Sequence, residues 1–170
     1  MAWWAHPPVV HRGAWRLCYR FVFNKRSAYW HGNEDQYDWN KGGGIGAFRR
    51  MDNMCMVAWR YVDGLFEVGP YWHPDGAAAM RRRGESGRVM PEDVGLVLPI
   101  LPDEVLYVRI TAVPGEPYRM LLWDTSDEHD ITCEGTCCPS LSREVSAWFG
   151  GTSMPKKVVR YHRERKAEKI

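Results

Sequence analysis

An acidic loop near residue 35 offers oxygen atoms that could hold a metal ion. Its polar side chains are Asn33, Glu34, Asp35, Asp38 and Asn40. Because Ca²⁺ binds carboxylate and carbonyl oxygens, Asp35 and Asp38 are candidate calcium ligands. The spacing is not that of an EF-hand, so a solvated acidic loop is the alternative. We expect no cofactor, with calcium as the candidate ion at this loop.

A second candidate metal site lies in a cysteine-rich segment. His129, Cys133 and Cys137 supply nitrogen and sulfur ligands of the kind that Zn²⁺ binds, and Cys138 follows directly. The spacing differs from the paired Cys-x-x-Cys pattern of common zinc sites. A disulfide that involves Cys133 and simple reduced thiols are the alternatives.

Arginine and aromatic side chains form a third group, and their chemistry suits a sugar ligand. Arginine presents a planar fork of donors that matches carboxylate or sulfate groups. Trp39 stands in a polar loop without an obvious core, so it is the best candidate for ring stacking, with a loop anchor as the alternative; Trp30 and Trp72 are weaker candidates. The predicted ligand-binding residues are Trp39, Arg20, Arg60, Glu67, Tyr71, His73 and Arg109, with Arg16 and Tyr107 on the same expected surface.

Catalytic chemistry has weaker support. A glycosidase needs two carboxyl groups across a cleft, and the sequence places no such pair. A polysaccharide lyase needs a base such as His73 or Tyr71 near an arginine that neutralises a uronate. No motif supports either reaction, so no catalytic residue is assigned.

A β-hairpin must position the central candidates. Asp63-Gly64 separates two strand-like runs between Asn53 and His73, which is typical of a two-residue type I′ turn. This turn places Arg60 opposite Glu67, a pair that could bind a ligand or simply fix the register. Alternation predicts a core face of Val57, Trp59, Tyr61, Phe66 and Val68. It predicts a mixed face of Met56, Ala58, Arg60, Glu67, Gly69 and Tyr71.

Other segments predict further strands, and residues 15–23 and 104–113 alternate most clearly. They are residues 15–23, 94–100, 104–113, 118–124, 145–149 and 156–161. We expect a polar and glycine-rich loop over 32–46, an edge strand over 77–83 and irregular structure over 125–143. Roughly nine or ten short strands separated by turns predict one all-β domain, an antiparallel β-sandwich of the jelly-roll type.

Charge distribution suggests how the chain is divided. Residues 156–170 carry seven lysines and arginines against two glutamates, although the whole chain has a net charge of only +2. We expect an extended lead-in over 1–14, the sandwich over 15–161 and a basic tail over 162–170. Such a tail is either a solvated terminus or a contact for an acidic partner. Nucleic acid is disfavoured because the arginines are scattered rather than gathered in one stripe.

The apolar segments are too short for a membrane span, and the N-terminal residues lack a signal-peptide pattern. We therefore expect a cytoplasmic or virion-associated protein. An odd count of five cysteines in such a protein favours mostly reduced thiols.

Three motifs together resemble a family of small uncharacterised bacterial and phage proteins. They are the Asp35-Gln36-Tyr37-Asp38-Trp39-Asn40-Lys41 loop, the Trp59-Arg60-Tyr61 strand that leads to Pro70-Tyr71-Trp72, and the Phe149-Gly150-Gly151-Thr152 segment followed by Pro155. The resemblance covers about residues 15–161 and implies a concanavalin A-like jelly roll, a fold of lectins and polysaccharide-active enzymes. Here Gly42, Gly43 and Gly44 replace the family's apolar residues, and the cysteine-rich segment and basic tail are additional.

Taken together, the sequence predicts a non-catalytic, lectin-like protein whose partner is a glycan or polysaccharide. The alternative is a structural, decoration or attachment protein that contacts other subunits of a phage particle or another assembly. A polysaccharide lyase or hydrolase ranks third.

Overall fold

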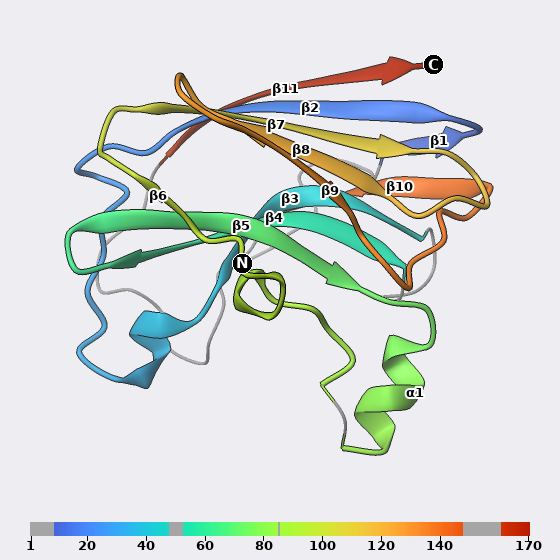
Figure 1. The fold of residues 1–170 in the computed structure, drawn as a ribbon, viewed down its shortest axis with the longest axis horizontal. Helices are drawn as coiled ribbons and strands as arrows, with labels where there is room; N and C mark the ends of the chain where they lie inside the picture. Colours follow the sequence, from blue (N-terminus) through green and yellow to red (C-terminus); the bar gives the residue numbers. More distant parts are fainter. Residues whose placement is uncertain (1–8, 48–52, 85, 148–160) are drawn as a thin grey trace.

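Two antiparallel sheets face each other in the computed structural model, which describes residues 9–47, 53–84, 86–147 and 161–170 (Figure 1). Sheet A contains, in spatial order, β1 (Val10–Arg12), β10 (Leu141–Val145), β3 (Asn40–Ala47), β4 (Met54–Val62), β5 (Leu65–His73) and β6 (Leu98–Ile100). Sheet B contains β11 (His162–Lys169), β2 (Trp15–Val22), β7 (Val105–Ala112), β8 (Arg119–Trp123) and β9 (Glu128–Thr132). The predicted all-β jelly-roll sandwich is confirmed.

The main core lies between the two sheets. Strict alternation in β2 buries Trp15, Leu17, Tyr19 and Phe21 and leaves the residues between them half-buried. The facing side chains of sheet A include Val57, Trp59, Phe66 and Val68, as the hairpin pattern predicts. Burial of such large aromatic and branched side chains stabilises the fold by about 1.5–3 kcal/mol each.

The β4–β5 hairpin has the predicted register. Asp63 and Gly64 both have positive φ angles, of 50° and 89°, as a type I′ turn requires. Arg60 lies opposite Glu67, and Met56 lies opposite Tyr71.

The outer face of sheet A is covered, which the sequence did not predict. Met54, Met56 and Ala58 of β4 and Tyr71 of β5 point away from sheet B, yet they are 0–3% exposed. They form a second apolar cluster with Trp39, and Met90 and Val97 pack against it. The face expected to be a mixed surface is therefore largely closed, and only its Arg60–Glu67 end is partly exposed.

The glycine-rich segment is a central strand rather than the predicted loop. β3 pairs with β4 and β10, with a bulge between Lys41 and Gly43. A Cβ atom on Gly42 would lie 2.8 Å from the Cγ1 of Val57, and one on Gly44 would lie 2.1 Å from the carbonyl oxygen of Cys55. The glycines are needed for this close approach, and a polarity pattern cannot report it.

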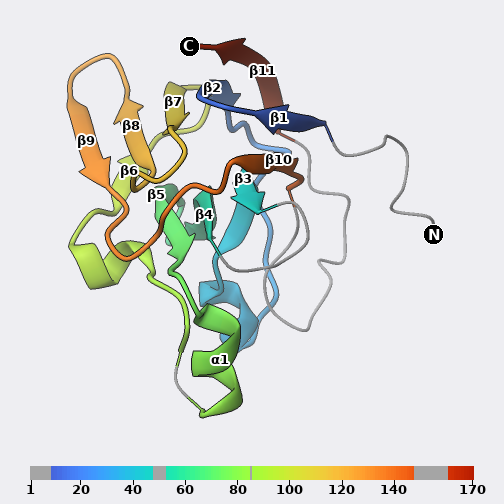
Figure 2. The same ribbon diagram turned by 90° about the vertical axis from the view of Figure 1, so that its right-hand side faces the viewer.

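Other segments differ from the predictions in detail. Residues 77–83 were expected as a strand, but the alanine-rich segment forms the helix α1 (Ala77–Arg82), since alanine favours helix. Figure 2 shows α1 outside the sandwich, on the side of sheet A. Two 3₁₀ turns, η1 (Glu34–Tyr37) and η2 (Pro91–Val94), precede β3 and β6. Residues 125–143 contain β9 and the start of β10, whereas the predicted strand over 156–161 falls almost entirely outside the described residues.

The sheets extend beyond the expected domain limits at both ends. Val10–Arg12, placed in the predicted lead-in, forms β1 on the edge of sheet A. His162–Lys169, placed in the predicted tail, forms β11 and pairs with β2 along its whole length. Within the described part of the chain, no helix is long and apolar enough to cross a membrane.

Candidate functional site

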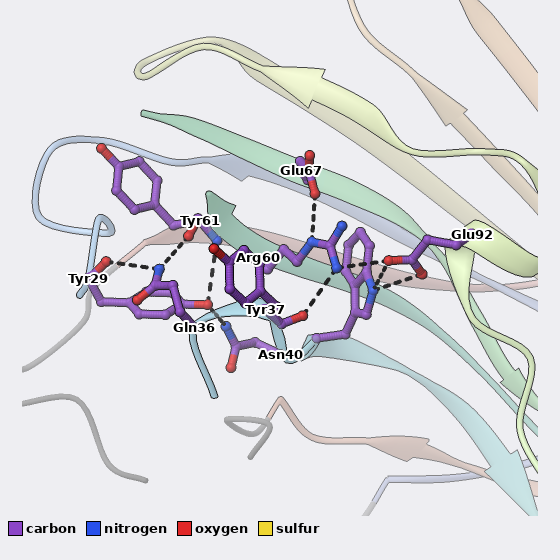
Figure 3. Close-up of polar contacts among 9 residues, drawn as sticks. Tyr29, Gln36, Tyr37, Asn40, Arg60, Tyr61, Glu67 and Glu92 are labelled. Carbon is purple, nitrogen blue, oxygen red and sulfur yellow. Dashed lines mark hydrogen bonds and ion pairs between the residues drawn. The ribbon is translucent and has the colours of Figure 1, made fainter. Parts of the chain in front are cut away.

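Arg60 is the centre of a polar network on the outer side of sheet A (Figure 3). Its Nε donates to Glu67 at 2.6 Å, and its Nη1 contacts Glu92 at 2.8 Å and the carbonyl oxygen of Tyr37 at 3.1 Å. The guanidinium carbon lies 4.3 Å from the centre of the Trp39 ring. Trp39 in turn donates through Nε1 to both carboxylate oxygens of Glu92. The network therefore connects η1 and η2 to β4 and β5 of sheet A.

Neighbouring residues of the same loop are also engaged inside the protein. Gln36 is buried, donates to the carbonyl oxygens of Tyr29 and Tyr61, and accepts from the amide of His31. Asn40 donates to the Tyr29 hydroxyl at 2.8 Å. The Asp-Gln-x-Asp-Trp-Asn-Lys motif thus holds its loop against the sheet.

Trp39 does not offer a free ring to a ligand, and its contacts fit the alternative of a loop anchor. It is 2% exposed, and Arg60 lies over its ring. Trp72 is also buried and donates through Nε1 to the carbonyl oxygen of Glu134. Of the three candidate tryptophans, Trp30 alone is accessible to a ligand, since 71% of it is exposed.

Tyr71, His73 and Lys41 meet on the covered face of sheet A. The Tyr71 hydroxyl lies 2.7 Å from Nε2 of His73, and Nζ of Lys41 lies 4.5 Å from the centre of the Tyr71 ring. Burial lowers the pKa of Lys41 to about 8, and the nearby positive charge of Arg88 acts in the same direction. All three side chains are buried, at 3–7% exposed, so a substrate could reach them only if this face opened.

The predicted metal sites are not assembled. Cys133 is buried and its Sγ lies 3.4 Å from Sγ of Cys55, whereas Cys137 is exposed and His129 lies on β9. Asp35 belongs to η1, and Asp38 caps its end. Among the residues that the structure describes, no group of three or more His, Cys, Asp or Glu side chains is arranged to hold a metal ion. The cysteines of the described segments are free thiols, so the alternative of a disulfide at Cys133 is wrong here.

The outer face of sheet B is open and contains a hollow of about 480 Å³. Register places Arg20, Tyr107 and Trp123 in one row across the strands, and Cys18 and Arg109 in the next. Tyr107 and Trp123 stack, with ring centres 5.3 Å apart. The residues around the hollow are Arg16, Cys18, Tyr19, Arg20, Tyr107, Arg109, Trp123, Glu164, Arg165, Lys166 and Glu168.

Two arginines in this hollow have unused donors. Arg20 contacts Glu164 at 3.5 Å, but within the described segments neither Arg16 nor Arg109 forms an ion pair. Nε of Arg16 is buried without a hydrogen-bond partner, and the Arg109 guanidinium lies 6.0 Å from the Trp123 ring centre. Four cationic side chains face the hollow (Arg16, Arg20, Arg109 and Lys166) against the carboxylates of Glu164 and Glu168, so its potential is positive, whereas Arg165 is paired with Glu144 of sheet A.

The structure therefore divides the surface that the sequence predicted as one. Arg16, Arg20, Tyr107 and Arg109 come together on sheet B, whereas the predicted Arg60, Glu67, Tyr71 and His73 lie on the opposite side of the sandwich. The prediction that these residues share one surface is wrong, because β2 and β4 belong to different sheets. Trp123 was missed; in the predicted strand over 118–124 it lies four residues after Arg119, which places both on the same face.

Comparisons with known proteins add little to this geometry. The chain has the architecture of an antiparallel β-sandwich protein, but no family model matches it, and no curated protein matches it. Among solved structures, it is similar to the alginate lyase vAL-1 from Chlorella virus. The sequences are 12% identical over 94% of this chain and 72% of that chain, with a TM-score of 0.47. A similarity of this size carries no argument about activity.

Proposed function

We propose that this protein binds carbohydrate, without cleaving it, through the hollow on the outer face of sheet B. The observation that carries the proposal is an open hollow of about 480 Å³ that combines the stacked Tyr107–Trp123 pair with several arginines. Aromatic rings pack against the apolar faces of sugar rings, and guanidinium groups donate to sugar oxygens.

Accessibility favours this face over the one that the hairpin suggested. The side chains of β2, β7 and β8 that face the hollow are half-buried, so they are held in place yet reachable. Trp39 and Tyr71 on the opposite side are only 2–3% exposed. A binding protein needs preorganised groups that a ligand can contact, and the sheet B hollow offers them.

A glycan array with the purified protein tests the proposal. We expect binding that Trp123→Ala weakens at least tenfold while Trp30→Ala leaves it unchanged. Trp30 is the matched control because it is exposed but lies outside the hollow, in the loop between β2 and η1. Loss with Trp30→Ala alone would move the site to that loop, and a blank array with folded protein would overturn carbohydrate binding. A role in a phage particle or another assembly would then take first place.

A second candidate, a polysaccharide lyase, rests on the Tyr71–His73 hydrogen bond of 2.7 Å and the adjacent Lys41. A hydroxyl paired with an imidazole can pass a proton, and a lysine with a pKa of about 8 can exchange one near neutral pH. β-Elimination from a uronate requires such a proton transfer. This reaction ranks below carbohydrate binding because the three side chains are buried.

Incubation with polyuronates tests the second candidate. A lyase would release unsaturated oligosaccharides, seen by their ultraviolet absorbance, and Tyr71→Phe would abolish the release while Trp123→Ala would not. No product from any polyuronate at high protein concentration would exclude the reaction.

A further inference from the structure

We propose that the hollow on sheet B recognises an internal stretch of an acidic polysaccharide, with Arg16 and Arg109 as the pair that holds a carboxylate or sulfate group. This inference rests on the proposed function and adds the class of ligand and the way it is held. Its evidence is the arrangement of charges on the outer face of sheet B.

A second hollow of about 180 Å³ adjoins the first and shares Arg16 and Arg109 with it. The second hollow extends over Thr111, Arg119 and Leu121 towards β9. The combined groove therefore runs across the sheet from β11 to β9. A groove that crosses the sheet accommodates the middle of a chain, whereas a single closed pocket would select a terminal sugar.

Arg16 and Arg109 lie at the junction of the two hollows. Arg16 is opposite Thr111 and Arg109 is opposite Cys18, so the two arginines are diagonal neighbours with Cβ atoms about 7–8 Å apart. Their long side chains can converge on one anionic group from two strands. Each guanidinium can form a two-pronged hydrogen-bonded pair with a carboxylate or sulfate, which a lysine cannot.

The neighbouring charges explain why these two arginines are the available ones. Arg20 is paired with Glu164, Arg119 with Asp130, and Lys166 with Glu168. In the described part of the chain, neither Arg16 nor Arg109 forms an ion pair, although Glu168 lies opposite Arg16 in the register and interacts with it electrostatically. An anion on a ligand would supply the acidic partner that these two guanidinium groups lack.

Acidic sugar is favoured over nucleic acid as the polyanion. The groove contains one stacked aromatic pair, Tyr107 with Trp123, rather than a series of rings for successive bases. Carboxylates such as Glu164, Glu168 and Asp130 also interrupt the positive surface. Closely spaced phosphates would meet these carboxylates, whereas a polysaccharide with fewer charges could avoid them.

Calorimetric titration with size-matched oligosaccharides tests the inference. The probes are polyuronate and sulfated oligosaccharides, neutral glucans of equal length, inorganic polyphosphate and single-stranded oligonucleotides. We expect the acidic sugars to bind most tightly, with affinity that rises with chain length and falls with salt. Arg16→Gln and Arg109→Gln should each weaken acidic-sugar binding about tenfold or more, and Arg16→Lys should recover only part of it.

Arg26→Gln is the matched control, because it removes the same charge from an exposed position outside the groove. Circular dichroism verifies that each variant is folded. Cys18 provides a second readout, since it lines the groove between Arg109 and Lys166. A bound acidic sugar should slow maleimide modification of Cys18 but not that of exposed Cys137.

The outcomes separate this inference from the proposed function. Neutral and acidic sugars could bind equally, with binding lost in Trp123→Ala but kept in the two Arg→Gln variants. That result would support carbohydrate binding and overturn the preference for acidic sugars. Polyphosphate or oligonucleotide binding as tight as that of acidic sugars would overturn it as well, because the surface would then bind polyanions in general. Absence of binding to any sugar would overturn both.

Discussion

Replacement of Arg60 by Met should destabilise the protein by about 3 kcal/mol. Methionine keeps much of the apolar contact but loses the charge and all the donors. The hydrogen-bonded ion pair with partly buried Glu67 contributes about 2 kcal/mol, the more exposed contact with Glu92 contributes below ~1 kcal/mol, and the stacking on Trp39 about 1 kcal/mol. The sum exceeds what a surface salt bridge supplies.

Urea unfolding followed by fluorescence measures this loss. In thermal unfolding of this chain of 170 residues, we expect Arg60→Met to lower Tm by about 6–12 °C. Amide hydrogen exchange should also accelerate over residues 34–39, because Arg60 holds that loop through the Tyr37 carbonyl and the Trp39 ring.

Arg20→Met is the matched control for stability. Its contact with Glu164 is 3.5 Å long, with the side chains 34% and 61% exposed, so its removal should cost below ~0.5 kcal/mol. A loss below ~1 kcal/mol in Arg60→Met, or one equal to that of Arg20→Met, would refute the conclusion that Arg60 has a structural role. Arg60 would then be free to bind a ligand, as the sequence first suggested.

Three further predictions follow from other parts of the fold. Gly44→Ala should cost at least ~3 kcal/mol in urea unfolding, because its Cβ would lie 2.1 Å from a backbone oxygen; a loss below ~1 kcal/mol would contradict this packing. Native-state alkylation should modify exposed Cys137 first and leave Cys55 and Cys133 unmodified until denaturant is added, since both are buried and burial raises the pKa of Cys55; mass spectrometry that finds Cys55 labelled early would refute it. Lys41 has a pKa of about 8 in the folded protein and its ordinary pKa of 10.5 in the unfolded chain. Between these pH values the unfolded chain therefore binds more protons than the folded protein. Stability relative to Lys41→Met should therefore rise as pH increases from about 8 towards 10.5, and a pH-independent difference would exclude the shift.

Turn chemistry and alternation were sufficient to predict much of the fold. Asp63-Gly64 fixed a hairpin register that the structure reproduces pair by pair, because a two-residue turn permits one alignment. The alternation over residues 15–23 and 104–113 predicted two strands, and β2 and β7 lie there. Both signals are local, so a single sequence carries them.

Packing between distant segments could not be predicted in this way. The glycines of β3 are conformationally ambiguous in sequence, and only the approach of Val57 and Phe21 explains them. Trp39 looked solvent-exposed because its loop is polar, but Arg60 and Glu92 cover it from positions 21 and 53 residues away. Sheet membership is likewise a long-range property, and without it Arg20 and Arg60 could not be assigned to opposite faces.

The edge strands of the two sheets affect how this protein associates with itself. β1 and β6 are three residues long, and Pro99 in β6 lacks an amide proton to donate. β9 and β11 carry dense charge, including Glu128, Asp130 and Lys166. Short strands, proline and charge are the features by which natural proteins discourage a neighbour's strand from extending a sheet. Copies of this protein at high concentration should therefore resist edge-to-edge aggregation, and any self-association should proceed through the faces of the sandwich instead.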